Sequence, residues 1–360
     1  MKEEAIQLLK GLTEAHSVPS HEEEVRDIFL KELEGKGEFS TDNLGSVFCE
    51  GSSEGPRVLV AGHMDEIGFL VQDITAEGFI SLVPVGGWWT HTLLSQRLQV
   101  KTRAGRKILG VVASRPPHQL SEVQRKQVMA IENLYLDVGV DNRAQVTDEL
   151  GIRIGDPVAP VTEFTAMDSE GRFMAKAFDN RVGMAAAIQA GGALLAETLP
   201  NRLIVGGTVQ EEVGLRGAKT AAVHAKPDVA IVLEGPPADD TPGMPRSSCQ
   251  GRLGGGVQIR MFDPTAITHP GLARFAVETA EREAIPHQVT VRRSGGTDAG
   301  SFHVANEGIP SVVIGVPARY IHSHNAIIDI EDQLNAVRLV QAMIRGLDQD
   351  VVSGFTKYIS

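Results

Sequence analysis

Hydrophobic side chains at helical spacing occupy the start of the chain. They recur three or four residues apart, which places them on one face of an amphipathic helix, so residues 1–35 are predicted to be helical. Ser20 followed by Glu23 matches a capping box and predicts that a second helix begins there. The apolar positions that carry this pattern are Ile6, Leu8, Leu9, Leu12, Val25, Ile28, Phe29 and Leu33.

Short apolar runs and helical patterns alternate in the second half of the chain. A similar apolar run at 57–61 predicts a buried strand that ends at Gly62 and His63. Strands that alternate with helices imply an α/β fold, with a mostly parallel sheet covered by helices on both faces. The predicted strands are 203–209, 229–235, 287–293 and 311–317, and the predicted helices are 181–199, 214–225, 269–284 and 331–349.

Between residues 70 and 161 helical periodicity is mostly absent, and short β-like runs alternate with Gly and Pro. This pattern predicts a small β-barrel or sandwich, with 121–134 as a helix or loop inside it. Trp88 and Trp89 fall in this region and are expected to be core or interface aromatic residues. The predicted domains are therefore an α/β domain at 1–69 and 166–360, and a β-rich insertion at 70–165.

The charge of the chain argues against some classes of partner. Its net charge is −12, so the surface is not expected to attract nucleic acid or anionic lipid. No apolar run approaches the roughly 18 residues that a membrane helix needs, and the N-terminal stretch lacks the apolar core of a secretory signal. Cys49 and Cys249 form no CxxC pair, which favours a reducing compartment. A cytoplasmic protein is expected.

Acids and histidines follow the predicted strand ends in five segments, beginning with GHMDEIG. His63 and Asp65 lie two apart on an extended segment, so their side chains point to the same side. A metal-ligating histidine usually donates its other ring N–H to a carboxylate, and Asp65 is placed to accept it. The second segment is AKAFDNRVG. When this segment is considered by itself, the simpler interpretation of Asp179 is the N-cap of the following helix.

The other three segments carry two glutamates side by side, a third glutamate and two histidines. Glu211 and Glu212 end an apolar strand, where adjacent carboxylates are costly unless they are paired with cations or metal. Glu234 ends another strand and alone would be read as a solvated acid. His322 and His324 share one side of an extended stretch, which alone favours neither a structural nor a metal-binding role.

Taken together, the five segments indicate a metal site. Open α/β sheets bind ligands beyond the carboxyl ends of their strands, so these side chains are expected to meet. Two imidazoles and three carboxylates suit a pair of divalent ions, with one carboxylate bridging them and one further carboxylate left to move protons. Neither a Walker phosphate loop nor an HExxH motif occurs in the chain.

These five segments, with GGTDAGS at 295–301, resemble the M42 family of metallo-aminopeptidases. This family includes glutamyl aminopeptidases, deblocking aminopeptidases and tetrahedral TET peptidases. SRPPH at 114–118 and the stretch 135–158 also look like family sequence. The resemblance covers essentially the whole chain.

The resemblance implies two divalent ions per chain, with zinc or cobalt expected first and manganese as a further candidate. It also implies Glu211 as the general base. Asp65, placed as the carboxylate partner of His63, is expected to take part in catalysis, and Asp298 or Glu234 are candidates by position to bind the substrate amino group. A cis peptide bond is expected after Asp179. The implied metal ligands are His63, Glu234, Glu212, His322 and Asp179, which would bridge both ions.

The same resemblance implies hydrolysis of N-terminal residues from short peptides. The β-rich insertion would be a β-barrel or PDZ-like dimerisation domain, and the dimers would assemble into a tetrahedral dodecamer. Two alternatives stay open, a deacylase or carboxypeptidase-type hydrolase on a related fold and a non-catalytic oligomeric scaffold. A preference for acidic N-terminal residues would need a basic pocket, for which Arg292, Arg293 and Arg319 are candidates. The resemblance assigns no function to His324.

Overall fold

Parallel strands form the centre of the molecule. The computed structural model describes residues 2–359, and its largest sheet has the strand order β1-β2-β12-β3-β13-β17-β14-β15, with β16 paired to β14. The neighbours β12, β3, β13 and β17 are parallel, which confirms the predicted mostly parallel sheet. The strands are β1 Glu38–Thr41, β2 Val47–Glu50, β3 Arg57–His63, β12 Arg202–Thr208, β13 Val229–Glu234, β14 Val257–Asp263, β15 Ala266–Ile267, β16 His287–Val291 and β17 Ser311–Gly315.

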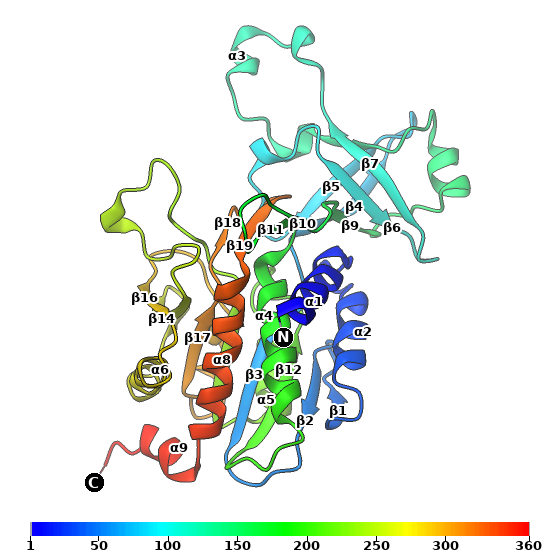
Figure 1. Ribbon diagram of the computed structural model, residues 1–360. Helices are drawn as coiled ribbons and strands as arrows, with labels where there is room; N and C mark the ends of the chain where they lie inside the picture. Colours follow the sequence, from blue (N-terminus) through cyan, green and yellow to red (C-terminus); the bar gives the residue numbers. More distant parts are fainter. Residues whose placement is uncertain (1, 360) are drawn as a thin grey trace.

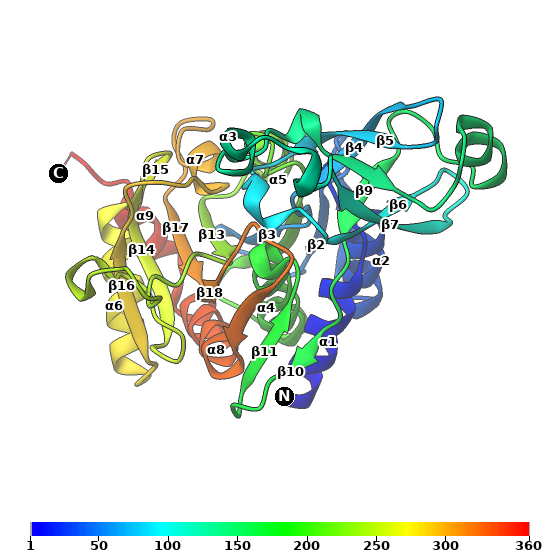
Figure 2. The same ribbon diagram turned by 90° about the horizontal axis from the view of Figure 1, so that it is seen from above.

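Helices cover both faces of this sheet, as Figures 1 and 2 show. Val58 and Val60 of β3 pack into one core, whereas Leu59 and Ala61 pack into the other. Because both faces are buried, these strands are continuously apolar. The helices on the first face are α1 Lys2–Glu14, α2 Glu23–Glu32, α4 Phe178–Leu194, α6 Pro270–Arg282, α8 Ile330–Gly346 and α9 Gln349–Phe355; those on the second are α5 Arg216–Ala225 and α7 Ala299–Phe302.

A closed barrel sits above the sheet domain in Figure 1, with the strand order β4-β5-β8-β7-β6-β9. It has its own core, which includes Phe69, Leu98 and Leu136. The structure therefore selects the barrel over the sandwich, and 121–134 contains the short helix α3 (Glu122–Arg125) within a loop. The barrel strands are β4 Gly68–Ile74, β5 Ile80–Val85, β6 Arg97–Lys101, β7 Lys107–Ala113, β8 Tyr135–Asp137 and β9 Pro157–Pro160.

A small second sheet connects the two parts and was not predicted. Its order is β10-β11-β19-β18, and it lies between the barrel and the helices in Figure 1. β11 leads directly into α4, and the β18–β19 connection is the 320–325 loop, so this sheet positions two of the five chemical segments. Its strands are β10 Thr165–Ala166, β11 Arg172–Ala175, β18 Ala318–Arg319 and β19 Ala326–Asp329.

The predicted capping box at Ser20 is wrong. Helix α2 begins at Glu23 and its N-cap residue is Glu22, whose side chain makes no capping bond. The Glu22 carboxylate instead accepts hydrogen bonds from the backbone N–H groups of Ser20 and Gln210. Residues 2–32 thus form two helices separated by a turn. No helix within residues 2–359 combines the length and the apolar character needed to cross a membrane.

Candidate functional site

Three neighbouring strands bring acids and a histidine to one edge of the large sheet. His63 is the last residue of β3, Glu234 is the last residue of β13, and Glu211 and Glu212 follow the end of β12. These strands are adjacent and parallel, so their carboxyl ends meet. The predicted convergence of these three segments is therefore observed.

His63 is buried and held by its own loop. Its Nδ1 lies 3.1 Å from the carbonyl oxygen of Asp65 and 3.5 Å from the Asp65 carboxylate. This leaves Nε2 facing the acids, 3.2 Å from Asp179 Oδ1 and 3.4 Å from Glu234 Oε1. A ring fixed through one nitrogen presents the other as a metal ligand.

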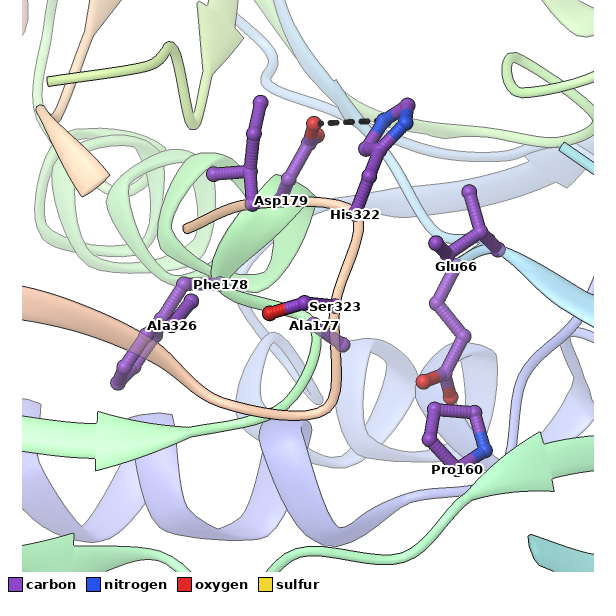
Figure 3. Close-up of a pocket in the computed structure, with 10 residues that line it drawn as sticks. Glu66, Pro160, Ala177, Phe178, Asp179, His322, Ser323 and Ala326 are labelled. Carbon is purple, nitrogen blue, oxygen red and sulfur yellow. Dashed lines mark ion pairs between the residues drawn. The ribbon is translucent and has the colours of Figure 1, made fainter. Parts of the chain in front are cut away.

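Asp179 lies between the two histidines of the cluster. Its Oδ1 faces His63, and its Oδ2 lies 3.4 Å from Nε2 of His322, the pair joined by the dashed line in Figure 3. The N-cap reading of Asp179 is wrong, because Asn180 takes that task and accepts the Gly183 N–H at 3.0 Å. The Asp179–Asn180 peptide bond is cis, as expected. The Asp179 carboxylate is thus placed to be shared by two ions.

His322 comes from the loop of the small sheet and completes the second half of the cluster. Its Nε2 lies 3.4 Å from Glu212 Oε1, while its Nδ1 lies 3.1 Å from the carbonyl oxygen of Gly87. Gly87 belongs to the barrel part, so both parts of the molecule orient this ring. His322 adopts a φ of 56°, a left-handed conformation that is uncommon for residues other than glycine.

The Asp65 carboxylate positions the backbone of Glu211 and Glu212. Its two carboxylate oxygens accept the backbone N–H groups of Glu211 at 2.9 Å and of Glu212 at 3.0 Å. The side chain is fully buried. Asp65 therefore links the loop of His63 to the turn after β12, and any effect on catalysis would act through those two neighbours.

The glutamates of the cluster are held in an environment that disfavours their charge. Burial raises the pKa of Glu211, Glu212 and Glu234. The positive charge of His63 opposes this shift in Glu211, whereas the charges of Glu234 and Glu212 add to it. A buried site with this surplus of negative charge is stabilised by bound cations.

The donor atoms fit divalent metal ions. Two groups of three residues, here called trios, could each hold an ion. Within each trio, one ligand atom per residue lies within 4.8 Å of the other two, and both trios include His63. Among residues 2–359, the buried Glu234 Oε2 has no hydrogen-bond partner. Imidazole nitrogens with carboxylate oxygens suit zinc, cobalt or manganese. The trios are His63, Glu211 and Glu234, and His63, Asp179 and Glu212.

A cavity of about 380 Å³ opens on the cluster and is lined by His63, Asp179, Glu211, Glu212, Glu234 and His322 among others. Arg260, which the sequence analysis did not single out, and Arg292 also line it, together with Asp239. Arg292 pairs with Asp239 at 2.6 Å. Arg319 pairs instead with Asp240 at 2.6 Å, and Arg293 is exposed. Of the three arginines proposed for a basic pocket, Arg292 alone is among the residues that line this cavity.

Asp298 and His324, which the sequence motifs also include, do not line the cavity at the cluster. Asp298 is buried, accepts a hydrogen bond from the Thr208 hydroxyl and is not among the residues that line the cavity. Burial raises its pKa to about 7. His324 is buried against Trp88, with 5.4 Å between ring centroids. The place of Asp298 outside the cavity lining gives no support to its predicted contact with the substrate.

An ionic network beneath the cluster was not predicted. Glu66 accepts hydrogen bonds from the Lys176 ammonium group at 2.6 and 2.7 Å and from Arg181 at 3.1 Å. All three side chains are buried, and burial lowers the pKa of Lys176 to about 8. Arg181 also donates to the carbonyl oxygen of Asp65 at 3.2 Å. The network therefore ties the His63 loop to the start of α4.

Replacing Glu66 with Gln is expected to lower the free energy of unfolding by about 3–5 kcal/mol, because two buried cations lose their counter-ion. Urea denaturation followed by far-UV circular dichroism measures this change. Glu197→Gln is the matched control, since it removes an exposed pair with Arg345, which is worth at most about 1 kcal/mol. Equal effects of the two substitutions would show that the network does not stabilise the fold.

Comparison with known proteins gives matches over nearly the whole chain. The sequence model of the M42 glutamyl aminopeptidase family matches residues 45–339. The glutamyl aminopeptidase of Lactococcus lactis is 40% identical over 359 residues, covering 97% of this chain and 98% of that protein. The lysyl aminopeptidase of Pyrococcus furiosus is 33% identical, covering 95% of this chain and 97% of that protein.

Solved structures with the same fold include large assemblies. The TET aminopeptidase of a marine sediment thaumarchaeon superposes with a TM-score of 0.94 at 38% identity, covering 98% of this chain and all of that one. The TET1 peptidase of Pyrococcus horikoshii, which can assemble into a tetrahedron or a large octahedral shell, superposes with a TM-score of 0.83 at 30% identity, covering 95% of this chain and 100% of that one.

Proposed function

The chain belongs to the M42 glutamyl aminopeptidase family and is a peptide hydrolase, and from the geometry of its site we propose that it removes N-terminal residues from short peptides in a metal-dependent reaction. The observation that carries this proposal is the Asp179 carboxylate, whose two oxygens face His63 and His322. A carboxylate placed between two sets of donors is what a two-metal hydrolase requires.

His63, Glu234 and Asp179 would hold one ion, and Asp179, Glu212 and His322 would hold the second. Two divalent ions held there would supply the Lewis acidity that acidifies a water molecule and polarises the scissile carbonyl group. Zinc or cobalt is the first expectation and manganese the next, because the donors are nitrogen and oxygen atoms that all three accept. The carbonyl and carboxylate of Asp65 keep the His63 ring oriented.

Glu211 is the residue we assign as general base. It lines the cavity, and its Oε2 lies 3.8 Å from His63 Nε2, a longer separation than those of Asp179 and Glu234. Its carboxylate would accept a proton from the attacking water and deliver it to the amine that leaves. Burial raises the pKa of Glu211 in the chain without metal, and bound cations would oppose this shift.

The surplus of carboxylates also explains the selection of a free N-terminus. A protonated α-amino group is a cation that Glu234 is placed to bind in the cavity, and acetylation removes that charge. Arg260 and Arg292 also line the cavity, where Arg260 pairs with Asp263 at 3.0 Å and Arg292 pairs with Asp239 at 2.6 Å. These two cations, together with the likeness to the glutamyl aminopeptidase of Lactococcus lactis, support an acidic over a basic side chain in the first residue of the substrate.

A panel of aminoacyl p-nitroanilides tests the proposal. We expect cleavage of free-amine substrates and none of their N-acetylated twins, with glutamyl preferred over lysyl by about tenfold in kcat/KM, because one favourable charge contact contributes about 1–2 kcal/mol. Release of acetate from the acetylated twins, with no p-nitroaniline, would instead establish a deacylase, and release of p-nitroaniline from them would show that a free N-terminus is not required. If none of the substrates is cleaved, the remaining alternative is that the protein is a non-catalytic scaffold.

Self-association of the chain is part of the same proposal. The barrel carries exposed apolar side chains at Leu109 and Val111, which would be covered if residues 70–165 act as the dimerisation domain. A tetrahedral dodecamer built from such dimers is proposed on the likeness to the TET1 peptidase. Both cysteines are free thiols, which fits the proposed cytoplasmic location.

A further inference from the structure

A second cavity, of about 700 Å³, adjoins the metal cluster at His322. One wall is the barrel segment that contains Trp88 and Trp89, and the other is the 320–325 loop. Ile321 and His322 line both this cavity and the first one. A ligand that passes the cluster from one cavity to the other therefore passes His322.

The two cavities differ in the side chains of their walls. Arg260 and Arg292 in the first are 5% and 8% exposed, although the exposed residues 294–296 line it as well. In the second, Trp89 is 64% and Tyr320 52% exposed. When a peptide is cleaved after its first residue, that residue needs room for one side chain, whereas the rest of the peptide must continue to solvent. The cavity with the buried arginines suits the first residue, and the cavity with the exposed rings suits the rest of the peptide.

The walls of the second cavity are suited to an apolar or aromatic side chain. Large exposed rings such as Trp89 and Tyr320 are costly in water and mark contact sites. Tyr320 has a left-handed backbone conformation with a φ of 60°. In the same wall, His324 is 2% exposed and its ring packs against Trp88, so it supports the wall.

We propose that this cavity binds the residue immediately after the scissile bond and selects a large apolar or aromatic side chain there. The inference rests on the proposed aminopeptidase function and extends it from the N-terminal residue to the leaving portion of the substrate. The barrel insertion then contributes directly to substrate binding through Trp89, in addition to orienting His322 through the Gly87 carbonyl.

Dipeptides that differ only in their second residue test this inference. The substrates are Glu-Phe and Glu-Gly, and the measured quantity is the ratio of their kcat/KM values within one variant, so that partial unfolding cancels. For the wild type we expect a ratio of about ten or more, since burial of a ring contributes at least that factor. In Trp89→Ala the ratio should fall to about two or less. The matched control is Leu94→Ala, an exposed apolar side chain of the same segment that does not line the cavity, which should keep the wild-type ratio.

A wild-type ratio near one, or an unchanged ratio in Trp89→Ala, would overturn the inference. If Trp89→Ala keeps the ratio but changes the particle mass measured by light scattering, Trp89 is a contact between copies of the chain and the inference also fails. Lack of cleavage of either dipeptide by the wild-type protein would instead refute the proposed function itself, and the inference with it.

Discussion

Glu211→Gln is expected to lower kcat by about 10²–10⁴-fold, the usual contribution of a general base, while the protein keeps its metal. The amide of Gln has the shape of the carboxylate but cannot accept a proton from water. The backbone of residue 211 stays in place, because its N–H group donates to Asp65 at 2.9 Å independently of the side chain. Steady-state kinetics and elemental analysis of the same preparation measure both quantities.

The control for this substitution is Glu197→Gln, which removes an exposed carboxylate paired with Arg345. It should leave kcat unchanged. Nearly full activity in Glu211→Gln would mean that another group takes the proton. Loss of metal together with activity would mean that Glu211 is a ligand, in agreement with its membership of one trio of potential donors.

Asp179→Asn is expected to remove both ions and reduce hydrolysis to the level of the uncatalysed reaction. Asn keeps the volume of the side chain but loses the negative charge that faces both His63 and His322. Even partners outside the ligand shell change metal affinity by about 10–100-fold, so the loss of a shared ligand should exceed this. Elemental analysis after dialysis measures the remaining metal.

Asp168→Asn is the matched control, because Asp168 is an exposed carboxylate in the turn after β10. It should retain the metal content of the wild type. A chain with Asn at 179 that still binds two ions would show that Asp179 does not bridge them. One ion retained would locate the stronger site, and would show that only one ion depends on this carboxylate.

Hydrophobic patterning predicted the sheet and its helices because long strands such as β3 and β13 are buried on both faces and therefore continuously apolar. It also predicted that His63 and Glu234 would meet, since the carboxyl ends of parallel neighbours lie at one edge. The small sheet was missed. Its strands are two to four residues long, too short for any periodicity to show.

Tertiary contacts explain what the sequence could not predict. Glu22 fits no local capping pattern, because its carboxylate binds the backbone of Gln210, which lies 188 residues away in the sequence. Lys176 and Glu66 are charged residues that would be expected at the surface, and their pairing with each other and with Arg181 permits burial. The Gly87 carbonyl that orients His322 is likewise invisible in a sequence pattern.

The most direct test of a metal-dependent aminopeptidase is a metal titration of the chelated wild-type chain, with hydrolysis of a free-amine glutamyl substrate followed at each step. The account predicts no hydrolysis by the metal-free protein and full recovery when two equivalents of zinc, cobalt or manganese are bound per chain. Substantial hydrolysis by protein that elemental analysis shows to be free of metal would contradict it.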